Sequence, residues 1–112
     1  MTQEPRGLAV VLTTAASDEQ ARGIATTLVE RKLAACVNFV PAMQSVYRWR
    51  GEIACEQECL LVIKTAADLF QEVCRAIRET HSYDLPEMIL LPIADADPDV
   101  RAWLEENLSP AP

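Results

Sequence analysis

The spacing of apolar residues divides the first third of the chain into a strand and a helix. The apolar run 8–12 predicts a buried strand that continues to Thr14. Ser17 stands three residues before Gln20, which is the spacing of a capping box, so we expect a helix to begin there. Residues at helical spacing predict the apolar face of this helix: Ala21, Ile24, Ala25, Leu28 and Val29.

The middle of the chain predicts a second strand and a hairpin. We expect a strand at about 35–40, followed by a bulge or sheet edge at Pro41, because proline cannot donate to a strand ladder. The alternating segment 46–50 then meets Gly51-Glu52, which predicts a hairpin turn. Residues 53–65 contain no breaker and end in an apolar run, so they predict one long strand.

The last third of the chain predicts helix, strand and helix. Asp68 or its neighbour is expected to cap the first of these helices, which ends near His81. Its apolar face is predicted to be Leu69, Phe70, Val73, Cys74 and Ile77. A loop leads to a strand at 88–93, and Asp97-Pro98 predicts the start of a final helix. The residues of this final helix expected to face inward are Val100, Trp103 and Leu104.

This order of elements predicts an α+β fold of the ferredoxin-like type, βαββαβ, with an added C-terminal helix. The predicted strand 53–65 would be about 43 Å long at about 3.3 Å per residue, whereas a globule of this size is about 34 Å across. We therefore expect the hairpin to protrude and to expose Tyr47 and Trp49. Exposed strand edges and aromatic patches are normally covered by another chain, so the sequence predicts an oligomer.

Composition restricts the class of protein. The chain has 112 residues, of which half are hydrophobic, and a net charge of −7. These values favour a single domain over residues 1–112 and disfavour disorder. The negative charge argues against nucleic acid as a partner, and no apolar run approaches the roughly 20 residues that cross a membrane. The first seven residues do not resemble an export signal, so we expect a cytoplasmic protein.

The four cysteines do not form a recognisable metal or redox motif. None belongs to a C-x-x-C pair, and Cys55 and Cys59 would lie about 13 Å apart on one strand face, too far to share a metal ion. We expect them to be reduced and mostly buried as small hydrophobic residues. Cys36 with a histidine would suit nucleophilic catalysis, but no local signature of such a site is present.

The polar residues near His81 are the first candidates for chemistry. His81 is the single histidine, and Tyr83, Asp84 and Glu87 follow it in a predicted loop, where polar groups are not required for packing. The alternative is a helix C-cap without further function. Glu58 and Lys64 share one strand face about 20 Å apart, so they can meet only through another chain.

Four segments resemble the CutA divalent-cation tolerance proteins, from about Val10 to Leu104. The segments are 33–38 (LAACVN), 45–51 (SVYRWRG), Glu58 with 63–65 (IKT), and 81–87 (HSYDLPE). Each is weak alone, whereas all four in this order are specific. The resemblance implies a ferredoxin-like homotrimer, a role in tolerance to copper and other divalent ions, and a pocket between subunits. The pocket residues that it implies are Cys36, Tyr47, Trp49, Glu58, Lys64, His81, Tyr83 and Glu87.

Some positions depart from the family pattern. Ser82 replaces the usual proline after the histidine, and Val100 replaces the usual tyrosine before the terminal tryptophan. Copper-binding members can carry a cysteine near the end of the first strand and two adjacent histidines, where this chain has Thr13 and Thr80-His81. One imidazole per chain does not hold Cu(II) tightly, so His81 is expected to be at most a weak ligand for copper or another divalent cation.

Three functions remain open from the sequence. The first is a trimer that binds a metal ion or small ligand and acts in metal homeostasis, without catalysis. The second is a small enzyme with His81 or Glu87 as general acid–base and Lys64 holding an anion. The third is a PII-like module that reports ligand occupancy to a protein partner, which fold analogy alone suggests.

Overall fold

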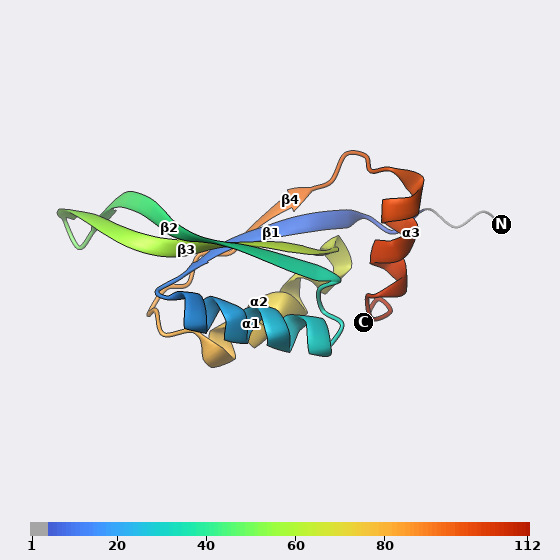
Figure 1. Ribbon diagram of the computed structural model, residues 1–112, viewed down its shortest axis with the longest axis horizontal. Helices are drawn as coiled ribbons and strands as arrows, with labels where there is room; N and C mark the ends of the chain where they lie inside the picture. Colours follow the sequence, from blue (N-terminus) through green and yellow to red (C-terminus); the bar gives the residue numbers. More distant parts are fainter. Residues whose placement is uncertain (1–4) are drawn as a thin grey trace.

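Four antiparallel strands form one sheet in the order β2–β3–β1–β4. The computed structural model describes residues 5–112 (Figure 1). Its strands are β1 (Leu8–Ala15), β2 (Cys36–Trp49), β3 (Glu52–Ala66) and β4 (Ile89–Pro92). Its helices are α1 (Asp18–Glu30), α2 (Phe70–Thr80) and α3 (Pro98–Glu106), with a 3-10 turn, η1 (Ala67–Leu69), before α2. The ferredoxin-like order of elements predicted from the sequence is confirmed.

The core lies between one face of the sheet and the two helices α1 and α2, which cover the same face (Figure 1). Alternate residues of β3 point into it, and Leu61 and Ile63 are fully buried there. Ile24 from α1 and Ile77 from α2 pack against them. The same alternation directs the other residues of these strands to the opposite face of the sheet, where neither helix lies.

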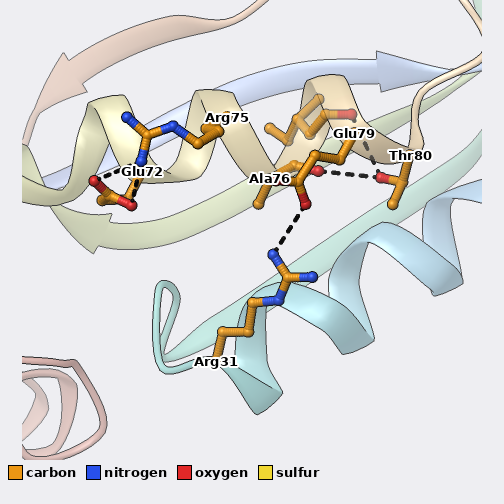
Figure 2. A network of polar contacts seen from close by, with 7 residues as sticks. Arg31, Glu72, Arg75, Ala76, Glu79 and Thr80 are labelled. Atoms are coloured by element: carbon orange, nitrogen blue, oxygen red, sulfur yellow. Dashed lines mark hydrogen bonds and ion pairs between the residues drawn. The ribbon is translucent and has the colours of Figure 1, made fainter.

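The two helices α1 and α2 also meet through surface charges. An ion pair joins the end of α1 to the end of α2 (Figure 2), and the Arg31 guanidinium in it lies 3.3 Å from a Glu79 carboxylate oxygen. Both side chains are half exposed, so this pair contributes well under about 1 kcal/mol to stability. Burial of the apolar faces, not this ion pair, therefore holds the helices on the sheet.

The β2–β3 hairpin extends beyond the helices, as the length of the strands predicts. The molecule measures 55 × 25 × 23 Å, and the far half of the hairpin forms its long end (Figure 1). The hairpin is longer than predicted because β2 is continuous from Cys36 to Trp49 instead of two pieces. Pro41 lies at the predicted bulge, where the register with β3 shifts between Val40 and Met43 and Ala42 has a positive φ of 61°.

Three local predictions were wrong. The hairpin turn is Arg50-Gly51, one residue earlier than predicted, and both residues have positive φ, as a two-residue type I′ turn requires. Neither Asp68 nor its neighbour caps α2 with a side chain: the N-cap position is the neighbour Leu69, which makes no cap bond, and the Asp68 carboxylate accepts from the Arg6 guanidinium at 2.6 Å. The strand β4 covers Ile89–Pro92 and not all of 88–93.

Several apolar side chains predicted to face inward are exposed. Val29 is 42% exposed, and Val100 and Trp103 on α3 are 50% and 48% exposed, while Leu104 is buried. Periodicity identifies an apolar face, but the side chains of this region that are buried in the cluster at the sheet end are Leu104 and the following Leu108. The apolar faces of helices α1 and α2 are otherwise as predicted.

The cysteines are all free, and two of them differ from the expectation of burial. Cys59 and Cys74 are buried, Cys36 is half-buried, and Cys55 is exposed on the far half of the hairpin. Burial raises the pKa of the Cys59 and Cys74 thiols. Cys55 was mispredicted because no helix reaches the part of β3 on which it lies.

Candidate functional site

A hollow of about 830 Å³ lies between the hairpin and the loop that follows α2. Its walls are Thr14 near the end of β1, residues 44–47 and Trp49 of β2, Glu56 and Glu58 of β3, and the loop residues 82–85 and Glu87. The sheet forms the floor of the hollow. Successive side chains of a strand point to opposite faces of the sheet, so Glu56 and Glu58, two residues apart, point to the same face. A second hollow of about 420 Å³ between α1 and α2 contains none of the predicted site residues.

Five of the predicted pocket residues line this hollow. They are Tyr47, Trp49, Glu58, Tyr83 and Glu87. Tyr47 of β2 pairs with Ala54 of β3, and Glu58 of β3 pairs with Met43 of β2. Paired residues lie on the same face of the sheet, so Tyr47 and Glu58 both point towards the hollow. The hairpin is tied to the loop by an exposed ion pair, in which Arg50 Nη2 lies 3.9 Å from Asp84 Oδ2.

The hollow is acidic. Glu56, Glu58, Asp84 and Glu87 contribute carboxylates, and the lining residues within the described chain include neither lysine nor arginine. Glu56 was not singled out from the sequence, and Asp84 was named there only as one of the polar residues that follow His81. The alternation around Glu58 and the position of Asp84 in the His81–Glu87 segment were the available signals for them.

Glu58 and Tyr83 form the closest polar contact in the hollow. The Tyr83 hydroxyl donates to Glu58 Oε2 at 2.7 Å. Partial burial raises the pKa of the Glu58 carboxyl, but the polar groups of Ser45, Tyr83 and Thr14 outweigh this effect and lower the pKa below its usual value. Burial, followed by the bond to the Glu58 carboxylate, raises the pKa of Tyr83. Glu58 is therefore ionised and Tyr83 protonated at neutral pH.

His81 lies next to this pair but uses its ring within the fold. Its Nε2 is 2.6 Å from the carbonyl oxygen of Thr14, and its Nδ1 accepts from the backbone N–H of Tyr83 at 3.0 Å. The side chain is part-buried and is not among those that line the hollow. Sequence reasoning placed His81 in the correct loop but could not reveal these bonds, since both partners are backbone groups.

Cys36 and Lys64 lie elsewhere in this protomer. They face each other across β2 and β3 at the end of the sheet opposite the hairpin turn. The Cys36 thiol contacts Asn38 Oδ1 at 3.8 Å. One chain thus does not bring these two residues to the hollow, and the meeting of Glu58 and Lys64 through another chain stays a prediction.

Side chains that could bind a metal ion are not clustered in the described part of the chain. Among residues 5–112, no three His, Cys, Asp or Glu side chains are grouped closely enough to hold an ion. The carboxylates of the hollow are therefore spread along its walls.

The helices of the described chain are too short or too polar to cross a membrane.

Comparison with known proteins gives consistent matches. The family of the CutA1 divalent ion tolerance protein matches residues 9–107. The Divalent-cation tolerance protein CutA of Thermus thermophilus is 47% identical over 98 residues, which cover 88% of this chain and 95% of that protein. The chloroplastic protein CutA of Arabidopsis thaliana is 39% identical, over 88% of this chain and 54% of its own length.

Solved structures agree with the sequence matches. The crystal structure of CutA1 from Oryza sativa superposes with a TM-score of 0.91 at 35% identity, covering 95% of this chain and 97% of that one. The Thermus thermophilus CutA1 structure gives 0.89 at 45% identity, covering 91% and 99%. The names of relatives include chloroplastic and periplasmic forms, so a cytoplasmic location stays a prediction. Because the family model, the relatives and the solved structures all match most of its length, this chain belongs to the CutA1 divalent ion tolerance family.

Proposed function

We propose that this protein acts in tolerance to divalent cations by binding a metal ion or a small ligand in the hollow between the hairpin and the 82–87 loop. Membership of a family named for divalent ion tolerance supports the cation. The observation that carries the location is the acidic lining of the hollow, with Glu56, Glu58, Asp84 and Glu87 around it. Carboxylate oxygens are ligands that hard divalent cations prefer.

The affinity for metal is expected to be weak in one chain. Glu58 already accepts the Tyr83 hydroxyl, and the other carboxylates do not converge on one point. Copper would be held poorly because the chain has one histidine, whereas a strong Cu(II) site needs several nitrogen ligands. We propose binding without turnover, because neither ring nitrogen of His81 is free to move a proton.

We further propose that the site is completed in a homotrimer. Support comes from the protruding hairpin, the sheet face that neither α1 nor α2 covers, and the exposed apolar residues Val46 and Ile53 on the hairpin. A second copy would cover these surfaces and would allow Lys64 or Cys36 of one chain to approach Glu58 of another. The trimer would thus supply the ligands that one chain lacks.

Titration of the purified protein with Zn²⁺ and Cu²⁺ tests this function. Calorimetry should show weak binding that Glu58→Gln reduces about tenfold or more, since a charge-assisted contact contributes about 1.5–3 kcal/mol and every 1.4 kcal/mol is tenfold. Glu30→Gln removes an exposed carboxylate outside the hollow and is the matched control. Equal affinities of wild type and Glu58→Gln would contradict the location, and no binding of either ion would contradict direct cation binding. Native mass spectrometry of fresh protein would report the stoichiometry and any retained ligand.

A further inference from the structure

The two hydrogen bonds of His81 determine where its proton lies. The Thr14 carbonyl oxygen, 2.6 Å from Nε2, can only accept a hydrogen bond, so Nε2 must carry a hydrogen. The Tyr83 backbone N–H, 3.0 Å from Nδ1, can only donate, so Nδ1 must be unprotonated. The ring is therefore neutral, in a single tautomer, with both nitrogens occupied by the protein's own backbone.

This bonding leaves no ring nitrogen available to a metal ion. A metal binds the lone pair of an unprotonated imidazole nitrogen. The Nδ1 lone pair accepts from Tyr83, and Nε2 carries the hydrogen that it donates to Thr14. Coordination at either nitrogen would break one of these bonds and release the loop or the strand end.

The same bonds connect β1 to the hollow. Thr14 belongs to β1 and pairs with Leu60 of β3, two residues from Glu58 on the same strand face. The His81 ring contacts the Tyr83 ring, with centroids 4.6 Å apart and planes tilted by 50°. The Tyr83 hydroxyl then donates to Glu58 at 2.7 Å. The path runs from the end of β1 through His81 and Tyr83 to a carboxylate in the wall of the hollow.

We propose that His81 is a positioning residue, which binds Thr14 and Tyr83 to hold the Tyr83 hydroxyl against Glu58, and that it is not itself a metal ligand. This role rests on the proposed function in one respect, which is that the hollow is the place where the ligand binds. Loss of the ring would free the backbone at Tyr83, and Glu58 would lose its fixed orientation. His81 would then affect ligand affinity without contacting the ligand.

The tautomer can be observed directly, because the chain has one histidine and its ring signals are unambiguous. Two-bond ¹H–¹⁵N correlation spectra at neutral pH should show a protonated Nε2 and an unprotonated Nδ1. Addition of Zn²⁺, a diamagnetic probe, should leave both ring nitrogen shifts unchanged. A coordination shift at either nitrogen, or the opposite tautomer, would overturn the proposal.

Three substitutions separate positioning from packing. His81→Asn keeps a polar atom near the place of Nδ1 to accept from Tyr83, His81→Gln keeps one near the place of Nε2 to donate to Thr14, and His81→Ala keeps neither. Hydrogen exchange at the Tyr83 amide should be accelerated about tenfold by His81→Ala and much less by His81→Asn. Equal acceleration in both variants would contradict the proposal, and if His81→Ala does not fold, His81→Gln replaces it as the variant without the acceptor.

Zinc titration of these variants distinguishes the two proposals. His81→Asn should retain zinc affinity within about twofold of wild type, because it restores the loop without an imidazole. A loss as large in His81→Asn as in His81→Ala would identify the imidazole as a ligand and overturn the positioning role. Absence of zinc binding in every form, wild type included, would count against the proposed function, while the tautomer and exchange results would still decide the role of His81.

Discussion

Two buried threonines show how the same side chain can be well or poorly accommodated. Thr65 on β3 is fully buried, and its hydroxyl donates to the Leu33 carbonyl oxygen at 2.7 Å. Thr13 on β1 is equally buried, but its hydroxyl has no partner among the described residues. A buried hydroxyl without a hydrogen bond costs about 1–3 kcal/mol of desolvation.

Replacing these threonines by valine should therefore have opposite effects. Thr13→Val should raise the free energy of unfolding by about 1 kcal/mol, because a methyl group replaces an unbonded hydroxyl of similar size. Thr65→Val should lower it by about 1 kcal/mol or more, since the Leu33 carbonyl loses its donor. Urea denaturation at one protein concentration measures both, and a change of the same sign in the two variants would contradict the prediction.

The Glu58 carboxylate, with the polar groups of Ser45, Tyr83 and Thr14 around it, should make stability depend on pH in the acid range. The pKa of Glu58 is lower in the folded chain than its usual value of 4.5. The contribution of this carboxylate is therefore fully present above pH 4.5 and is lost as the pH falls through the folded pKa. The difference in unfolding free energy between wild type and Glu58→Gln should shrink below that pH. A difference that stays constant from pH 7 to pH 3 would contradict the lowered pKa of Glu58 in the folded chain.

At the scale of elements, the strain in the hairpin turn is local and correctable. Arg50 and Gly51 both have positive φ, of 51° and 83°, although only glycine adopts this region without cost. Arg50 otherwise contacts the Trp49 ring at 5.4 Å and Asp84 at 3.9 Å, and the ion pair is largely exposed. These surface contacts are worth little compared with the backbone preference.

Arg50→Asn should stabilise the hairpin. Asn-Gly is the preferred pair for a type I′ turn, and an ordinary residue in the left-handed region costs about 1 kcal/mol, so a gain of up to that amount is expected. Arg48→Asn serves as the control on β2, where asparagine is disfavoured and stability should fall. Thermal unfolding at fixed protein concentration compares the two. A lower melting temperature for Arg50→Asn would mean that the side-chain contacts of Arg50 stabilise the protein by more than its positive φ destabilises it.

The order of elements was predictable, whereas some of their limits and contacts were not. Helical and alternating patterns reflect the burial of one face, so the core residues Ile24, Leu61, Ile63 and Ile77 follow from them. The continuity of β2 could not be predicted from these patterns. Pairing with β3 keeps β2 extended on both sides of Pro41, whereas a proline read from the local sequence predicts the end of a strand. The bonds of His81 were also unpredictable, since they depend on where two distant backbone segments meet.

At the scale of the whole molecule, the elongated shape agrees with assembly. The 55 Å long axis and the exposed Ile53, at 71%, leave apolar surface on the hairpin that one chain cannot bury. Light scattering at low micromolar concentration should give close to three times 12.4 kDa. A stable monomer would remove the basis for a site shared between chains.

A charge on the hairpin should disrupt this assembly. Ile53→Lys places an ammonium group where an interface would exclude water, so the apparent mass should fall towards that of one chain. Gln71→Lys adds the same charge on exposed α2 surface and is expected to leave the mass unchanged. If both variants keep the wild-type mass, Ile53 does not lie in the interface.

The central position of β1 has a consequence for how the chain folds as it is synthesised. The register joins Val11 to Ile63 on one side and to Leu90 on the other, whereas β2 and β3 meet through the adjacent turn. The hairpin can therefore form early from local contacts, but the first strand must wait for partners made much later. Until the segment 89–92 leaves the ribosome, one edge of β1 stays unpaired, so a nascent or truncated chain ending before it should be the species most prone to aggregate.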